Sequence, residues 1–162
     1  MAERPIIAIP IGDAAGVGPE IVIRAVSSPA VNERARCLVV GDGSVLKQAM
    51  SYPGMPQLQI HKVEAPAQGS YALGVLDLID LNRLDCSQLK LGQVSAMCGQ
   101  AACAYIEKSV ELALSGVVDA VSTPPINKEA LRAAGVPYIG HTELFGALTN
   151  TPDPLTMFEV RN

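Results

Sequence analysis

The sequence predicts an α/β protein with three layers (α/β/α), in which helices cover both faces of a largely parallel sheet. Short apolar runs rich in Val and Ile alternate with segments of helical character. Hydrophobic residues make up 49% of the chain and are mainly Ala, Val, Leu and Ile, as in buried parallel strands and the helices packed on them. The length of 162 residues suits one domain.

Strand and helix signals alternate through the first half of the chain. Strands are expected at residues 5–12, 36–42 and 58–63, and helices at residues 19–28 and 45–50. Pro19 and Glu20 suit a first helical turn, since proline needs no N–H partner there and an acidic side chain complements the helix dipole. Ser44 is a candidate N-cap for the second helix.

The second half is expected to hold a long helix, a strand and a short helix. From Gly99 to Gly116, apolar residues recur at spacings of three and four, as on one face of a helix. A buried strand is expected within residues 117–126, where two prolines stop it. A short helix is expected over residues 127–135, with Asn127 as its cap. Residues 152–162 have the composition of a turn that leads into a new strand, so we expect a chain cut short at its C-terminal end.

Composition narrows the functional class. The net charge is −4 and no basic run occurs, which argues against a nucleic-acid partner. No apolar run reaches the length of a membrane span, and the N-terminus lacks the features of a signal peptide, so we expect a cytoplasmic protein without a membrane partner. The four cysteines form no Cys-x-x-Cys pair, which indicates free buried thiols rather than a zinc site.

A glycine loop follows the first strand. Gly12, Gly16 and Gly18 stand in "GDAAGVGPEIV", between a strand and a helix. The spacing is not that of the dinucleotide fingerprint, and Asp42 is only a loose match for its acidic residue. The loop could approach an anion through its backbone N–H groups, or it could be a tight turn alone; the residues leave both open.

Two further stretches carry side chains that could act on a ligand. Lys128 in "STPPINKEAL" follows a strand end, where α/β proteins collect ligands; it could hold a phosphate or carboxylate, act in proton transfer, or be a solvated surface lysine. His141 and Thr142 in "GVPYIGHTELFG" precede an apolar helix-like run, where they could cap the helix or bind a ligand. His61, in a strand-like run, is expected to be structural.

Together these three stretches resemble the 4-hydroxythreonine-4-phosphate dehydrogenase family, from about Ile7 to the last residue. The Gly-His-Thr-Glu block with the upstream Pro-Ile-x-Lys-Glu carries the resemblance. The opening "GDAAGVGPE" is also similar to the start of isopropylmalate and isocitrate dehydrogenases, which share the fold. The Gly-His-Thr-Glu block favours the first family over an isopropylmalate-type enzyme.

The resemblance implies a homodimeric enzyme that uses NAD and a divalent metal (Zn, Mg, Mn or Co). Such an enzyme oxidises a secondary alcohol on a small 4-phosphorylated 3-hydroxy acid, and decarboxylation follows. The resemblance also implies that His141 and Thr142 contact the substrate's phosphate or carboxylate, and that Lys128 lies at the edge of the active site. Gly12, Gly16 and Gly18 would form a close-packed turn near the site.

The resemblance covers only part of the family's length. It implies that three metal-ligand histidines lie beyond Asn162, and that the residues which hold the substrate phosphate and most of NAD are also absent from this chain. No metal ligand is therefore expected in this chain, which is expected to be inactive alone. The alternative is a non-catalytic half-domain that binds a phosphorylated ligand or dimerises.

Overall fold

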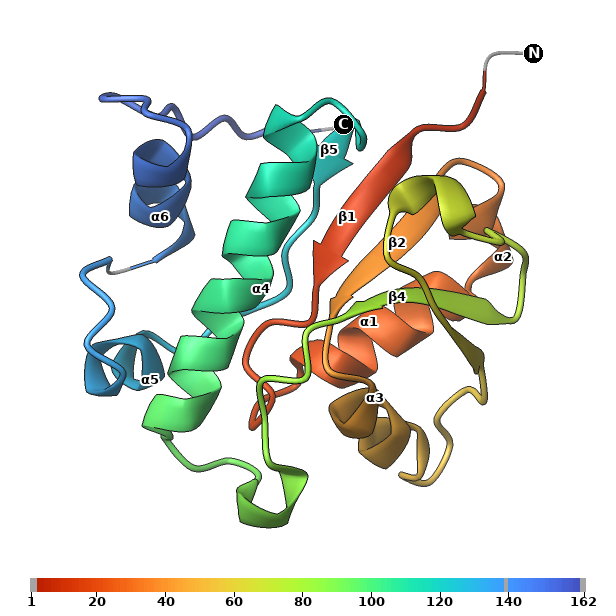
Figure 1. The fold of residues 1–162 in the computed structure, drawn as a ribbon, viewed down its shortest axis with the longest axis horizontal. Helices are drawn as coiled ribbons and strands as arrows, with labels where there is room; N and C mark the ends of the chain where they lie inside the picture. The colour runs from red at the N-terminus through yellow and green to blue at the C-terminus, as the bar shows by residue number, and fades with distance from the viewer. Residues whose placement is uncertain (1–2, 139, 161–162) are drawn as a thin grey trace.

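The computed structural model describes residues 3–138 and 140–160, and its strands form one sheet (Figure 1). The strands are β1 (Ile6–Pro10), β2 (Arg36–Gly41), β3 (Gln59–Lys62), β4 (Val75–Asp80) and β5 (Ala120–Val121). In the described residues the order is β3-β4-β2-β1-β5, and every neighbouring pair is parallel. The expectation of a largely parallel sheet is confirmed.

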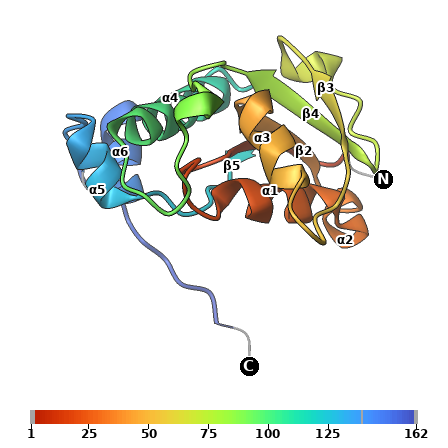
Figure 2. The same cartoon turned by 90° about the horizontal axis from the view of Figure 1, so that it is seen from below.

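Helices cover both faces of this sheet. They are α1 (Gly18–Ser27), α2 (Pro29–Asn32), α3 (Gly43–Met50), α4 (Ala96–Leu114), α5 (Lys128–Ala133) and α6 (His141–Leu148). Helices α1 and α3 pack together on one side, and α4 crosses β1 and β2 on the other (Figures 1 and 2). Right-handed crossovers require this, because the chain moves in opposite directions along the sheet from β1 to β2 and from β4 to β5. The three-layer prediction is therefore confirmed.

Helices α5 and α6 lie against the outer side of α4 (Figure 1). A second apolar cluster joins the three helices, formed by the buried residues Cys103, Ile106, Val110, Leu131 and Leu144. It is separate from the main core, which fills the space between the sheet and helices α1, α3 and α4. Leu131 and Leu144 anchor α5 and α6 in this cluster, and the candidate site residues stand at the starts of these two helices.

Most predicted elements appear within a few residues of their expected bounds, but the helix caps differ. The N-cap of α3 is Asp42 rather than Ser44, and its carboxylate does not cap the helix. It accepts hydrogen bonds from the amides of Arg83 and Leu84 instead. Helix α4 begins before Gly99 because Ser95 caps it, accepting from the amide of Cys98.

Strand predictions failed in three places. Strand β4 was not expected, although Leu76 and Leu78 are fully buried; the two aspartates in "VLDLID" interrupt its apolar pattern. The strand expected at 117–126 is only two residues long and lies half exposed at the sheet edge, so the expectation of a buried strand was wrong. The new strand expected after residue 152 is also absent from the described part of the chain, up to residue 160.

Residues 153–160 extend away from the body of the protein (Figure 2). Four large apolar side chains on this segment are strongly exposed: Leu155, Met157, Phe158 and Val160. The segment is extended and apolar, as a strand is, which explains why its sequence pattern resembled one. The residues have the composition of one, but pairing needs a partner that the described residues do not supply.

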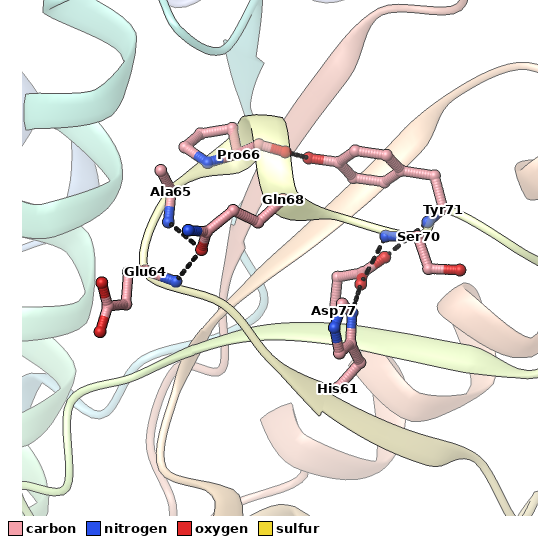
Figure 3. A network of polar contacts seen from close by, with 8 residues as sticks. All are labelled: His61, Glu64, Ala65, Pro66, Gln68, Ser70, Tyr71 and Asp77. Atoms are coloured by element: carbon pink, nitrogen blue, oxygen red, sulfur yellow. Dashed lines mark hydrogen bonds and ion pairs between the residues drawn. The ribbon is translucent and has the colours of Figure 1, made fainter.

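A polar network holds the connection between β3 and β4 (Figure 3). The carboxylate of Asp77, only 1% exposed, accepts from the amides of Ser70 and Tyr71 at 2.9 and 2.7 Å. Its Oδ1 also lies 2.7 Å from Nδ1 of His61. The hydroxyl of Tyr71 donates to the carbonyl of Pro66 at 2.7 Å. His61 therefore has a structural partner, as expected from its strand-like surroundings.

The cysteines are free thiols, as expected. Cys98 and Cys103 are buried, but Cys37 and Cys86 are only half-buried, which corrects the expectation that all four are buried. Burial, and then the nearby Glu107 carboxylate, raise the pKa of the Cys103 thiol to about 12. Over residues 3–138 and 140–160, no helix is both long and apolar enough to span a membrane.

Candidate functional site

Lys128 is placed by the cap of its own helix. The Asn127 side chain accepts hydrogen bonds from the amides of Glu129 and Ala130, at 2.9 and 3.1 Å. This confirms the predicted cap and fixes Lys128 as the first residue of α5. The lysine is exposed, and the segment before it runs through two prolines from the end of β5.

Gly140 brings Lys128 close to the start of α6. Gly140 is the buried N-cap of this helix, so Thr142 is not the cap, and no side chain caps the helix. A β-carbon on Gly140 would lie 3.6 Å from Cε of Lys128 and 3.5 Å from a carboxylate oxygen of Glu143. The structure thus places Lys128 beside the Gly-His-Thr-Glu block, although 12 positions separate Lys128 from Gly140 in the sequence.

His141 is the first residue of α6 and is half-buried. Its ring stacks on Phe145, with centroids 6.1 Å apart and planes 18° apart. Its Nε2 atom is buried and has no hydrogen-bond partner among the described residues. Burial lowers the pKa of the imidazole below its ordinary value of 6.5, because desolvation disfavours the charged form. At neutral pH His141 is therefore an uncharged hydrogen-bonding group, suited to a ligand oxygen but not as a source of positive charge.

Thr142 is exposed on the same helical turn. Its hydroxyl makes no hydrogen bond within residues 3–138 and 140–160. The side chain therefore has its hydrogen-bonding capacity available at the surface next to His141.

The glycine loop packs tightly against the segment that leads to Lys128. Gly12 has a φ of +72°, and a β-carbon there would lie 2.6 Å from the carbonyl oxygen of Pro125. The Asp13 amide donates to that same oxygen at 3.4 Å. A β-carbon on Gly18 would overlap the carbonyl oxygen of Ile11.

The loop also uses its own backbone donors. The amide of Gly16 donates to the Asp13 carbonyl at 3.1 Å, and that of Ala15 donates to the Asp13 carboxylate at 3.0 Å. Because these N–H groups point inward, the geometry favours the tight turn over the anion-binding loop. Burial raises the pKa of Asp13, and the Ala15 hydrogen bond opposes that shift.

Asp42 cannot take the role of the acidic residue in a dinucleotide site. Its side chain is fully buried, and both oxygens accept backbone hydrogen bonds from the loop after β4. Asp42 is therefore excluded as the acidic residue of a dinucleotide-binding fingerprint. Asp42 instead holds that loop, which carries Arg83, in place.

Two hollows flank residues 136–138. The larger, of about 600 Å³, lies between α4 and residues 134–138, with Arg83, Gln100 and Tyr138 in its lining. The smaller, of about 230 Å³, is lined by Lys128, Arg132, Val136, Pro137 and Tyr138. Sequence reasoning missed Arg132 and Tyr138. Arg132 could have been found, since it stands four residues after Lys128 on a predicted helix and therefore on the same helical face.

The fold is a parallel sheet with helices on both faces, and Lys128 lies beside the Gly-His-Thr-Glu block after the last strand. These features define an α/β protein of the class that binds small ligands near strand ends. Comparisons with known proteins identify the family. Residues 33–162 match the family model described as "Pyridoxal phosphate biosynthetic protein PdxA", and the chain belongs to this family. The resemblance inferred from the motifs is confirmed.

Individual relatives agree with this assignment. A Clostridium botulinum protein provisionally named D-threonate 4-phosphate dehydrogenase is 51% identical over 98% of this chain and 47% of its own length. A Symbiobacterium thermophilum protein with the same provisional name is 51% identical over 99% of this chain and 48% of its own length. The chain thus spans about half the length of the curated relatives it matches.

A solved structure supports the fold. The 4-hydroxythreonine-4-phosphate dehydrogenase from Burkholderia phymatum superimposes with a TM-score of 0.89 and 41% identity, over 94% of this chain and 46% of that one. The relatives named here are dehydrogenases, so the family is one of oxidoreductase enzymes.

Proposed function

We propose that this chain is part of an NAD- and divalent-metal-dependent dehydrogenase that oxidises, with decarboxylation, a small 4-phosphorylated 3-hydroxy acid. D-Threonate 4-phosphate and 4-hydroxythreonine-4-phosphate are the candidate substrates, because relatives carry these names. The observation that carries the proposal is the position of Lys128 beside Gly140, at the start of the helix that presents His141 and Thr142. This arrangement offers one cation and two uncharged hydrogen-bonding groups to an anionic, hydroxylated ligand.

Each of these residues has a proposed role. The Nε2 atom of His141 and the hydroxyl of Thr142 bind oxygens at the substrate's phosphate or carboxylate end. Lys128 lies at the edge of the site and supplies positive charge, since His141 is uncharged at neutral pH. Gly12, Gly16 and Gly18 form the compact turn that supports the segment before Lys128.

The described residues do not fit a metal site. No three His, Cys, Asp or Glu side chains among residues 3–138 and 140–160 come together in a way that could hold an ion. We therefore derive no step through the metal from this chain. When bound in the whole enzyme, the metal would polarise the alcohol oxygen and then the carbonyl oxygen.

The glycine loop and Asp42 do not fit NAD either. The amides of Ala15 and Gly16 are used within the turn, and the Asp42 carboxylate is occupied. The proposals of NAD as cofactor, of a homodimer and of a cytoplasmic location rest on the family resemblance.

The alternative function is a non-catalytic half-domain that binds a phosphorylated ligand or dimerises. It is favoured by the lack of a metal-ligand cluster in the described part of the chain. Calorimetry of the 162-residue chain with a candidate substrate and with Zn²⁺, Mg²⁺, Mn²⁺ or Co²⁺ separates the ideas: tight metal binding by this chain would contradict our expectation that it holds no metal ligand.

The direct test uses a chain extended to the length of its relatives. The absorbance of NADH is followed with NAD, a divalent metal and either of the two candidate substrates. We expect NADH to form with at least one of them and to stop when the metal is removed by a chelator. No NADH with either substrate, from a folded protein, would refute the proposed activity.

A further inference from the structure

Helix α5 lies very close to the backbone of α4 at Gly99. Figure 1 shows α5 beside the N-terminal half of α4, which contains this glycine. Gly99 is buried, and a β-carbon on it would overlap the carbonyl carbon and oxygen of Ala130 in α5. The same β-carbon would lie 2.8 Å from the amide nitrogen of Leu131. Only a residue without a side chain therefore fits between the two helices at this point.

The peptide group that faces Gly99 is bound within α5 at both of its polar atoms. The amide of Leu131 donates to the carbonyl of Asn127 at 3.0 Å. The carbonyl of Ala130 accepts from the amide of Ala134, also at 3.0 Å. Non-bonded heavy atoms pack at about 3.5 Å or more, so a methyl group on Gly99 would move α5 away from α4 by on the order of 1 Å. The helix has to move as a unit, because moving this peptide alone would break the two hydrogen bonds.

Side-chain packing holds α5 in the same place. Leu131 is fully buried in the second apolar cluster, which also contains Cys103 and Ile106 of α4. These two residues follow Gly99 by four and seven positions, so all three lie on one face of α4. Helix α5 has only six residues, and a helix this short has little stability of its own. Its position is therefore set by its contacts with α4.

Lys128 lies between two close backbone approaches. Ala130, two residues after Lys128, meets Gly99. Pro125, three residues before Lys128, has its carbonyl oxygen 2.6 Å from the position of a β-carbon on Gly12. Over residues 3–138 and 140–160, Lys128 forms no ion pair that could hold its side chain. The place of the lysine therefore depends on the backbone that carries it, which α4 and the glycine loop hold at either end.

We propose that Gly99 is a positioning residue for Lys128. Its lack of a side chain lets α5 lie against α4, and this contact sets the distance between Lys128 and the start of α6, where Gly140 lies beside the lysine stem. A misplacement of about 1 Å in a site can lower a rate by a factor of about a hundred. The consequence for substrate binding rests on the proposed function, whereas the dependence of the lysine's position on Gly99 does not.

The first experiment measures the distance from Lys128 to Gly140 by NMR in the 162-residue chain. The readout is the NOE between the ε-methylene protons of Lys128 and the α-protons of Gly140, which falls with the sixth power of the distance. We expect Gly99→Ala to weaken this NOE several-fold, because α5 moves away from α4. An unchanged NOE in the folded variant would overturn the proposal.

The matched control is Gly116→Ala, just after the end of α4. Gly116 has a φ of +71°, so the substitution strains the backbone, but no atom lies within 4 Å of the new β-carbon. It therefore lowers stability without displacing α5, and the NOE between Lys128 and Gly140 should stay as in the wild type. An equal weakening in both variants would mean that loss of stability alone moves the lysine, and would refute a specific role for Gly99.

Leu131→Ala replaces Gly99→Ala if the latter does not fold. It removes the apolar anchor of α5 and introduces no overlap with α4, so α5 is free to move away from α4. The NOE between Lys128 and Gly140 should weaken here too. A full-strength NOE in folded Leu131→Ala would show that the contact between α4 and α5 does not set the position of the lysine.

The second experiment tests whether Gly99 acts through Lys128. In the chain extended to the length of its relatives, we expect Gly99→Ala to raise KM for the phosphorylated substrate about tenfold and to leave KM for NAD unchanged. In the Lys128→Gln background, Gly99→Ala should add less than about twofold, since an effect that acts through the lysine is lost with its charge. Two effects that simply multiply would show that Gly99 supports only the fold.

The two proposals fail separately. If the extended wild-type chain forms no NADH but the NOE weakens in Gly99→Ala, the dehydrogenase activity is refuted and the positioning of Lys128 by Gly99 stands. If NADH forms and the NOE keeps its full strength in folded Gly99→Ala, the activity stands and the positioning role is refuted.

Discussion

A β-carbon on residue 12 would lie 2.6 Å from the carbonyl oxygen of Pro125, across the boundary between the glycine loop and the segment before α5. These two positions are more than a hundred residues apart, yet nothing larger than glycine fits between them. The glycine loop is therefore a close-packed contact between the end of β1 and the segment before α5. Its packing fixes the position of the segment that leads to Asn127 and Lys128 in the candidate site.

Gly12→Ala should destabilise the protein by about 3 kcal/mol, since the new methyl group meets backbone and the positive φ adds strain. Gly16→Ala is the matched control in the same loop. Its β-carbon would lie 3.5 Å from the nearest atom, an ordinary contact, so we expect a change below about 1 kcal/mol. Chemical denaturation measures both. Equal losses would show that the close approach to Pro125 does not matter.

His141→Gln should weaken substrate binding about tenfold or more in the chain extended to family length, because it displaces the donor or acceptor at Nε2. The stacked ring also contributes packing, so a loss of about 1 kcal/mol in stability is expected. Phe145→Leu is the control, as it loses the stacking but keeps the imidazole. If both variants lose stability and neither loses substrate affinity, His141 is structural.

The pH dependence of stability should carry a signature of His141. Its pKa is lowered by burial, so below the ordinary value of 6.5 the unfolded chain binds a proton that the folded chain binds less readily. Stability is therefore present above that pH and falls as the pH drops through the folded pKa. Chemical denaturation at a series of acidic pH values gives the free energy of unfolding. This free energy should fall more steeply with decreasing pH for the wild type than for His141→Gln. Parallel curves would contradict the burial of the imidazole.

Asp77→Ala should cost about 3 kcal/mol, because it leaves the amides of Ser70 and Tyr71 without their acceptor. His61→Ala should cost below about 1 kcal/mol, since the imidazole is 43% exposed and only one of three donors is lost. A control, Asp153→Ala, removes an exposed carboxylate from the segment after α6 and should change stability far less. Hydrogen exchange at residues 63–74 should rise in Asp77→Ala before the rest of the sheet is affected.

Alkaline pH should destabilise the protein partly through Tyr71. Burial, and then the Asp77 carboxylate, raise the pKa of its phenol from 10.0 to about 12, with Arg36 opposing the shift. Between these values the unfolded phenol has lost its proton and the folded one has not, so stability falls as the pH rises above 10. Tyr71→Phe should be less stable at neutral pH, through loss of the bond to Pro66, but should lose less on going to alkaline pH. Absorbance of tyrosinate against pH provides the measurement.

The sequence predicted features that depend on local patterns. The parallel sheet, the cap at Asn127 and the start of α5 at Lys128 follow from strand composition and helix signals, which act over a few residues. The residues left open whether Gly12 and Gly18 form a tight turn or an anion-binding loop, and the close contacts of both residues favour the turn that the family resemblance implied.

Features that depend on distant partners were missed. Strand β4 was hidden because Asp77 reads as a solvated residue, whereas three donors from β3 and the following connection allow its burial. Asp42 was misread because its partners lie about forty residues further on. Arg132 and Tyr138 form one lining only after residues 134–138 fold back against α4.

The extended segment 153–160 has a practical consequence for the purified chain. An extended backbone that belongs to no strand of the described sheet, and that carries four bare apolar side chains, is a template for pairing with a second copy. Turbidity and loss of soluble material should therefore grow with protein concentration. Replacing Met157 and Phe158 by lysine should lengthen the shelf life of concentrated samples without affecting the sheet.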